Sequence, residues 1–157
     1  MKGDPAIVDV LNECLTAELT AINQYYVHYK MCENWGYARL AAEKREESID
    51  EMKDADKIIE RILFLDGIPN MQRLNPVRVG ENVKEMHEVD LQLEIENCER
   101  LNKAIDLARD KGDNGTRELL VTILEGEEKA VDHLEAQLHL IGEVGLEGYL
   151  GEMIHGA

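Results

Sequence analysis

The sequence predicts an all-α chain, folded as a four-helix bundle with a long crossover between the second and third helices and a short fifth C-terminal helix. Apolar residues recur every three or four positions over long stretches, which is the spacing of one helix face. Proline and glycine are sparse and divide the chain at a few points. We expect residues 1–157 to form a single domain, because this length is enough for one full core.

The first two helices are each expected to be nearly 30 residues long. Asp4 followed by Pro5 is typical of a helix start, and the helical spacing continues to about residue 35. A second helix is expected over about 37–65, where the sequence Asp66-Gly67-Ile68-Pro69 ends it. The connection that follows, to about residue 80, is long enough to cross the bundle from end to end.

Glycines mark the ends of the remaining helices. A third helix is expected over about 81–111 and a fourth over about 116–141, separated by the Gly112–Gly115 turn. Gly142 and Gly145 precede a short last helix over about 146–154. Four long helices with apolar stripes bury those stripes by packing together.

Composition excludes several classes of function. Thirty-three acidic against 17 basic residues give a formal charge of -16, so the surface should attract cations and repel nucleic acid and anionic membranes. Such acidity is equally compatible with solubility alone. The chain has no long apolar run and no apolar signal region, so we expect a cytoplasmic protein. Three cysteines without a CxxC motif argue against disulfides or a zinc site.

Four glutamates occupy positions on core-facing stripes. Glu18 in the first helix and Glu127 in the fourth interrupt otherwise apolar stripes, and Glu51 and Glu94 hold comparable positions on more polar ones. A lone buried carboxylate costs several kcal/mol unless it is paired or bound to a cation. Four of them, one from each helix, are therefore expected to cluster around metal.

The spacing of these glutamates favours the same interpretation. Glu18 and Glu51 are 33 residues apart, and so are Glu94 and Glu127 (51 − 18 and 127 − 94), so two helix pairs would supply equivalent ligands. Oxygen ligands suit iron, manganese or magnesium better than zinc or copper. The alternative is that the four are unrelated surface glutamates, since the chain has 33 acidic residues.

The chain resembles the bacterioferritins along its whole length. The resemblance implies a ferritin-like fold, a 24-subunit cage that stores ferric mineral, and a di-iron ferroxidase centre with Glu18, Glu51, Glu94 and Glu127 as catalytic metal ligands. The stretches that carry it are Glu18-Leu19-Thr20-Ala21-Ile22-Asn23-Gln24-Tyr25, Asn34-Trp35-Gly36-Tyr37, Ser48-Ile49-Asp50-Glu51-Met52-Lys53, Leu63-Phe64-Leu65-Asp66-Gly67-Ile68-Pro69-Asn70, and Gly145-Leu146 through Tyr149-Leu150.

Two positions depart from the family pattern. The family has histidine three residues after each of two glutamates, whereas this chain has Asp54 after Glu51 and Ala130 after Glu127. Asp54 retains an oxygen ligand, Ala130 has none, and His133 is expected to point away from the site. We therefore expect slow or absent ferroxidase activity. The alternative is a working ferroxidase with an unusual, carboxylate-rich ligand set.

The resemblance also implies further sites. Met52 and its symmetry mate would ligate a haem b at a two-fold interface, with Asn23 and Lys53 at pocket positions. Glu46 and Asp50, one turn apart, would line the cage interior and gather iron; the alternative is a solvated acidic face.

Expected partners follow from the same resemblance. They are further copies of this chain or a second bacterioferritin subunit with intact histidines, together with a ferredoxin-type reductant. A different class of protein, a DNA-protecting mini-ferritin or a di-iron oxidase, is disfavoured by the acidic charge and by the expected fifth helix.

Overall fold

Four helices account for most of residues 1–155, the part of the chain that the computed structural model describes. They are α1 (Pro5–Asn34), α2 (Ala38–Phe64), α3 (Val83–Asp110) and α4 (Asn114–Met153). The all-α four-helix bundle predicted from the sequence is confirmed, and the starts of all four helices lie within about two residues of the predicted ones.

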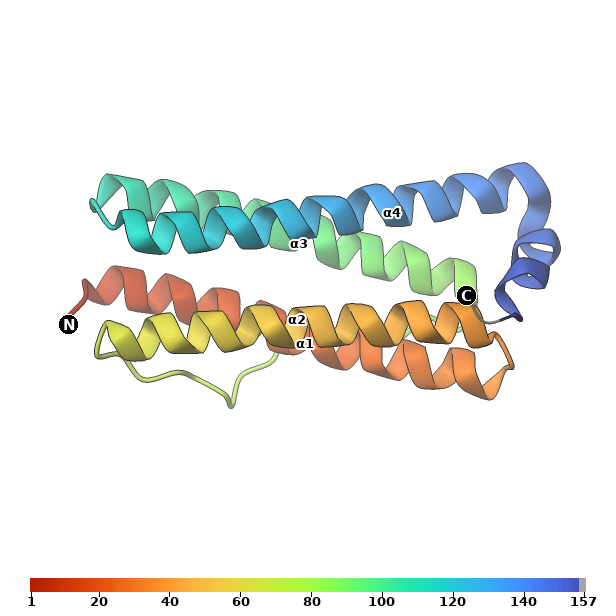
Figure 1. The fold of residues 1–157 in the computed structure, drawn as a ribbon, viewed down its shortest axis with the longest axis horizontal. Coiled ribbons are helices and arrows are strands. Elements are labelled where there is room, and N and C mark those ends of the chain that lie inside the picture. Colours follow the sequence, from red (N-terminus) through yellow and green to blue (C-terminus); the bar gives the residue numbers. More distant parts are fainter. Residues whose placement is uncertain (156–157) are drawn as a thin grey trace.

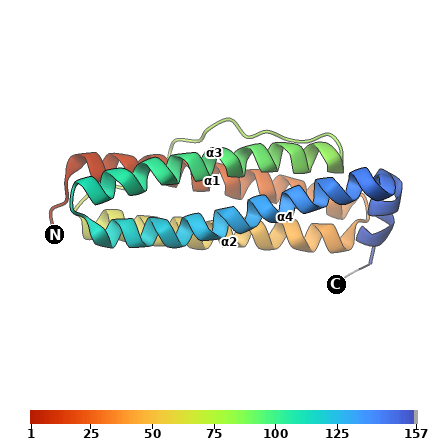
Figure 2. The ribbon, with the colours of Figure 1, turned by 90° about the horizontal axis from the view of Figure 1, so that it is seen from above.

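The helices form two antiparallel pairs, α1 with α2 and α3 with α4, which pack on each other lengthwise. Figures 1 and 2 show that α2 and α3 run in the same direction. The chain therefore has to return along the bundle between them, and residues 65–82 do so as an extended crossover without helix. This confirms the long crossover that the sequence predicted.

Polar side chains fix where three of the helices begin. Asp4 accepts a hydrogen bond from the backbone N–H of Ala6 at 2.8 Å, with Pro5 in the first turn. Asn82 and Asp113 cap α3 and α4 in the same way. The predicted helix start at residue 81 lies two residues before Val83, the first residue of α3.

The predicted fifth helix is not a separate element. Residues 146–153 are the last part of α4, so the expectation that the fourth helix ends at residue 141 is wrong. Helical structure continues through Gly142, because a single glycine is tolerated inside a helix. Gly145 alone leaves helical geometry, with φ 78° and ψ 156°, and the helix kinks there and turns across the end of the bundle (Figure 1).

The crossover is held against α1 by side chains spaced one or two helical turns apart. Its backbone N–H groups donate to α1 side chains at distances of 2.8 to 3.1 Å. These side chains form one polar stripe, because four residues are slightly more than one helical turn. The pairs are Asn70 with Asn12, Asn75 with Thr20, Arg78 with Gln24, and Gly80 with His28.

The apolar core is divided in two by buried polar residues. One apolar cluster lies near the start of α1 and includes Leu11, Ile58 and Leu120; the other lies near its end and includes Leu40 and Met86. Between them lie buried polar and charged side chains, namely Glu18, Gln24, His28, Lys44, Ser48, Glu51, His87, Asp90, Glu94 and Glu127. The functional candidates are therefore in the middle of the bundle.

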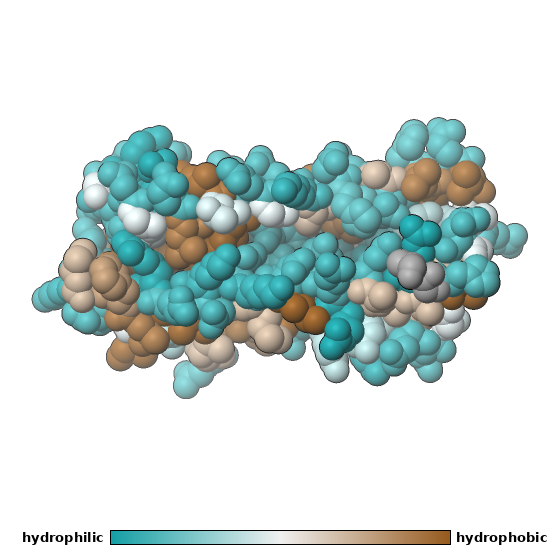
Figure 3. Space-filling model, in the orientation of Figure 1, coloured by the Kyte–Doolittle hydropathy of each residue, from teal (hydrophilic) through white to brown (hydrophobic). Residues whose placement is uncertain are grey.

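The surface reflects the acidic composition. Figure 3 shows one face of the molecule as mostly hydrophilic, with the larger hydrophobic areas toward the two ends of the bundle. Exposed large apolar residues include Met52, Phe64, Ile68 and Met71. Over residues 1–155, none of the helices combines the length and the apolar character that crossing a membrane requires.

Candidate metal centre

Four carboxylates from three helices converge in the middle of the bundle. One oxygen from each of Glu18, Glu51, Asp54 and Glu127 lies within 4.8 Å of the others. Glu51 and Asp54 are three residues apart on α2, so they share a face of that helix. The three glutamates are at most 3% exposed, whereas Asp54 is half-buried. This group is called the carboxylate cluster below.

Glu94 of α3 is placed beside the carboxylate cluster rather than within it. It is fully buried, and its Oε1 accepts a hydrogen bond of 2.8 Å from the hydroxyl of Tyr25. Negative charge on Glu51 and Glu127 adds to burial in raising the pKa of Glu94, so the three carboxylates are near neighbours. All four glutamates predicted from the stripes therefore face one region of the interior.

Burial makes this region strongly unfavourable for bare negative charge. It raises the pKa of Glu18 and Glu51 well above the usual range, and neighbouring carboxylates raise both further. For Asp54, burial and the charge of Glu127 raise the pKa to about 7. In the absence of a cation, these groups therefore hold protons at a pH where exposed carboxyls are ionised.

The buried glutamates also have unused hydrogen-bonding capacity. Within residues 1–155, Oε2 of Glu18, Glu51, Glu94 and Glu127 has no hydrogen-bond partner. Leaving buried polar atoms unpaired is costly, and several such oxygens directed at one place suit a bound cation. The donor set, which is oxygen throughout, fits hard cations such as ferrous or ferric iron.

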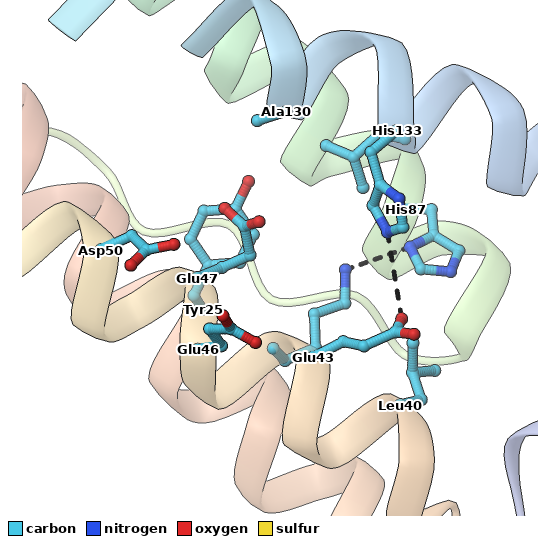
Figure 4. Close-up of a pocket in the computed structure, with 11 residues that line it drawn as sticks. Tyr25, Leu40, Glu43, Glu46, Glu47, Asp50, His87, Ala130 and His133 are labelled. Atoms are coloured by element: carbon cyan, nitrogen blue, oxygen red, sulfur yellow. Dashed lines mark hydrogen bonds and ion pairs between the residues drawn. The ribbon is translucent and has the colours of Figure 1, made fainter. Parts of the chain in front are cut away.

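A cavity of about 240 Å³ lies between α2 and α4 (Figure 4), and its wall includes Tyr25, the hydrogen-bond donor to Glu94. Ala130 lies in its wall, and Glu47 extends toward it from α2. Burial, together with the charges of Asp50 and Glu127, raises the pKa of Glu47 to about 7. Further residues in the wall are Tyr25, Leu40, Glu43, Lys44, Glu46, Asp50, His87, His133 and Leu134.

The two acidic residues predicted to gather iron lie at this cavity. Glu46 and Asp50 are exposed, and both line it. Asp50 also lines a second, more open cavity, of about 470 Å³, which reaches Glu51, Asp54 and Glu127. Of the two predicted surface acids, Asp50 thus shares a cavity with the carboxylate cluster, whereas Glu46 lines only the smaller cavity.

The expectation that His133 points away from the site is only partly correct. His133 is not among the converging ligands, but it lines both cavities beside Ala130. It follows Ala130 by three residues and so lies on the same face of α4. Counting its rotation from Glu127 alone concealed this relationship.

The predicted haem residues are on the outer surface of the first helix pair. Met52 is 55% exposed, so it is not part of the apolar core. Asn23 is exposed and donates to the carbonyl of Leu19 at 2.7 Å, and Lys53 is exposed near Asp50. None of the three takes part in the carboxylate cluster, and their role in haem binding stays a prediction.

A second buried polar group was not predicted from the sequence. Lys44 of α2 forms an ion pair of 2.7 Å with Asp90 of α3, and both are at most 3% exposed. Gln24 and His28 of α1 also hydrogen-bond Asp90, at 2.9 and 3.2 Å. Although burial raises the pKa of Asp90, Lys44 and His28 outweigh it and hold that pKa below its usual range.

The same group extends through His87 to the end of α4. Tyr149 donates to Oε1 of Gln137 at 2.7 Å, so its oxygen accepts from Nε2 of His87 at 2.9 Å. Nδ1 of His87 then accepts from Lys44 at 3.0 Å. Burial and the Lys44 charge lower the pKa of His87 to about 2, which keeps it neutral. The sequence did carry a signal for this network, namely three polar residues on core-facing stripes: Lys44, His87 and Asp90.

Comparison with known proteins identifies relatives along nearly the whole chain. Residues 8–144 match the ferritin family, described as a ferritin-like domain. The chain is 49% identical to a bacterioferritin of Mycolicibacterium paratuberculosis over 98% of this chain and 97% of that one. It is 47% identical to a bacterioferritin of Streptomyces coelicolor over 98% and 92%, and 44% identical to one of Brucella melitensis over 95% and 92%.

Proposed function

The chain belongs to the bacterioferritin family, and on that premise we propose that it is one subunit of an iron-storage cage of 24 subunits. The observation that carries the proposal is the carboxylate cluster, whose buried oxygens have no partner among residues 1–155. Ferrous iron is the substrate that this set of ligands would bind, and dioxygen the oxidant. The acidic surface would concentrate the cation around the subunit.

We propose that oxidation at this centre is slow when the chain acts alone. Asp54 and Ala130 stand where the family pattern has histidines, so one neutral ligand is replaced by a carboxylate and another is missing. Glu18, Glu51, Glu94 and Glu127 balance two divalent cations, and Asp54 adds a fifth negative charge. A more anionic site that lacks one neutral ligand favours oxidised or hard cations, but it organises two ferrous ions poorly for oxidation.

A working ferroxidase with a carboxylate-rich ligand set is the alternative. The position of Asp54 favours it, because its oxygen converges with those of Glu18, Glu51 and Glu127. In either case the residues of this chain have the same tasks. The carboxylates bind and orient the cations, Tyr25 fixes one oxygen of Glu94, and the apolar clusters at both ends exclude water.

Stopped-flow oxidation of ferrous iron by the assembled protein distinguishes a slow centre from a working ferroxidase. We expect slow turnover that rises at least about tenfold in the double variant Asp54→His with Ala130→His. Rapid turnover of the unaltered chain, with no gain in the double variant, would instead establish the alternative. Native mass spectrometry tests the cage: about 24 subunits are expected, and a dodecamer or dimer would contradict it.

We also propose that two copies share a haem b through Met52. The exposed thioether fits this role, since a core methionine would be buried, and Asn23 and Lys53 are exposed as well. When bound, the haem supplies electron transfer. Haem-replete expression followed by a pyridine haemochrome spectrum tests the proposal: haem should be present in the unaltered protein and lost in Met52→Leu. A second subunit type and a ferredoxin-type reductant stay predictions.

A further inference from the structure

One histidine lines the cavity on the side where Ala130 provides no ligand. His133 lies three residues after Ala130, about 4.5 Å farther along α4. Helical side chains lean toward the N-terminus and cover the preceding turn, which for His133 is the turn of Ala130. The small Ala130 side chain leaves this space open, and His133 lines both cavities that meet there.

Within residues 1–155, the ring nitrogens of His133 make no short hydrogen bond. Its closest charged neighbour is Glu43, and Nε2 of His133 lies 3.9 Å from Oε2 of Glu43 (Figure 4). This distance is beyond hydrogen-bonding reach, and Oε2 of Glu43 has no hydrogen-bond partner within residues 1–155. His133 is also 46% exposed, so a change of rotamer meets little resistance.

The other histidine in the wall of the cavity, His87, already has both ring nitrogens in hydrogen bonds. Both ring nitrogens of His87 are used, one by Lys44 and the other by Tyr149. His28, which is buried nearby, bonds Asp90 through one nitrogen and the N–H of Gly80 through the other. Among the histidines close to the carboxylate cluster, His133 is thus the one with a nitrogen available to a cation.

Unpaired oxygens in the same cavity point to a cation as its occupant. Glu51 and Glu127 line the more open cavity together with Ala130 and His133. Each glutamate is at most 3% exposed and has an oxygen without a hydrogen-bond partner in the described chain. A cation bound by these oxygens on the Ala130 side would lie between the carboxylates and the imidazole of His133.

We propose that His133 supplies a nitrogen ligand to a divalent cation held by Glu51 and Glu127, in place of a histidine at position 130. The inference rests on the proposed function, because it assumes that the carboxylate cluster binds metal. Imidazole nitrogen suits zinc and ferrous iron and carries no charge, so it completes the site without adding to its negative charge.

X-ray absorption spectroscopy on protein loaded with one equivalent of Zn²⁺ tests the proposal, since imidazole gives a characteristic multiple-scattering signal. We expect one imidazole ligand in the unaltered protein and none in His133→Gln, with zinc affinity at least about tenfold weaker by calorimetry. His139→Gln is the matched control, because His139 is exposed on the same helix and outside both cavities. This control should retain the imidazole signal and the affinity.

Two further variants separate the possible failures. In Ala130→His, an imidazole is supplied directly, so adding His133→Gln should leave the signal unchanged. Glu127→Gln should abolish zinc binding; full retention of zinc would place the metal elsewhere and overturn the proposed function together with this inference. An all-oxygen zinc shell in the unaltered protein, or an imidazole signal that survives His133→Gln, would overturn the inference alone.

Discussion

The hydroxyl of Tyr25 lies 2.8 Å from Oε1 of Glu94, and both side chains are at most 1% exposed. This hydrogen bond uses one oxygen of Glu94 and leaves Oε2, which has no partner among residues 1–155, for a cation. A donor stabilises the charged form of a carboxylate, so it partly opposes the effect of burial on the pKa of Glu94. Tyr25 therefore reduces the competition of a proton with a cation for Glu94, although burial and the neighbouring carboxylates still keep the pKa of Glu94 raised.

Removing this donor should weaken cation binding. In Tyr25→Phe, a proton competes more strongly for Glu94, and we expect zinc affinity near pH 6.5 to fall about two- to tenfold, the worth of one hydrogen bond. Isothermal titration calorimetry measures it. Tyr26→Phe is the control, because Tyr26 is 54% exposed. Equal affinities in all three proteins would show that Tyr25 has only a packing role.

The metal-free protein should lose stability as pH rises, in part through Asp54. Its pKa is about 7 when folded, against an ordinary value of 3.8, so between about pH 4 and pH 7 the folded chain binds more protons than the unfolded chain. Stability from this group is present below about pH 4 and is lost as pH rises toward 7. Asp54→Asn, which cannot ionise, should lack this loss.

Calorimetric melting in the presence of a chelator checks this prediction. The melting temperature of Asp54→Asn should be higher than that of the unaltered protein near pH 8 and close to it near pH 4. The control is Asp56→Asn, at an exposed position on the same helix, which should melt with the unaltered protein at both pH values. A difference of the same size at both pH values would exclude ionisation of Asp54 as the cause.

The Lys44–Asp90 ion pair should be costly to break from one side. Lys44→Met leaves the Asp90 charge buried without its cation, a loss of about 3–5 kcal/mol, which corresponds to a melting temperature about 6–20 °C lower. Adding Asp90→Asn removes that charge and should recover part of the loss. If the double variant melts lower still, an isolated charge is not the source of the effect.

The kink in α4 should depend on glycine at position 145 and not at position 142. Gly145 has φ 78° and ψ 156°, a region that other residues enter at a cost of about 1–3 kcal/mol. Gly145→Ala should therefore lower the melting temperature by about 2–12 °C. Gly142 is helical with open space around its Cα, so Gly142→Ala should raise the melting temperature slightly. The same sign for both variants would contradict this explanation.

Sequence periodicity was sufficient to predict the helices and the convergence of the buried glutamates. The stripes through Glu18 and Glu127 predicted inward-facing carboxylates, and both are at most 2% exposed. The length of the connection after residue 65 predicted the crossover. Both predictions rest on local spacing, which a single chain fixes through the helical repeat.

Relations between helices could not be predicted in the same way. The contact of Lys44 with Asp90 and His87 depends on how α2 and α3 are positioned along each other, which neither helix determines alone. The place of His133 beside the cavity depends on the small size of Ala130 as much as on its own position. Gly142 and Gly145 look alike in sequence, and only packing at the end of the bundle decides which of them bends the helix.

The hydrogen bonds between the crossover and α1 constrain how the length of this segment can vary. The backbone N–H groups between Asn70 and Gly80 meet α1 side chains that are four or eight residues apart and share one face of the helix. An inserted or deleted residue would misalign every later contact up to the start of α3. Substitutions on the outward side of this segment, such as at Met71 and Leu74, leave the alignment intact, so divergence here should proceed by replacement rather than by insertion or deletion.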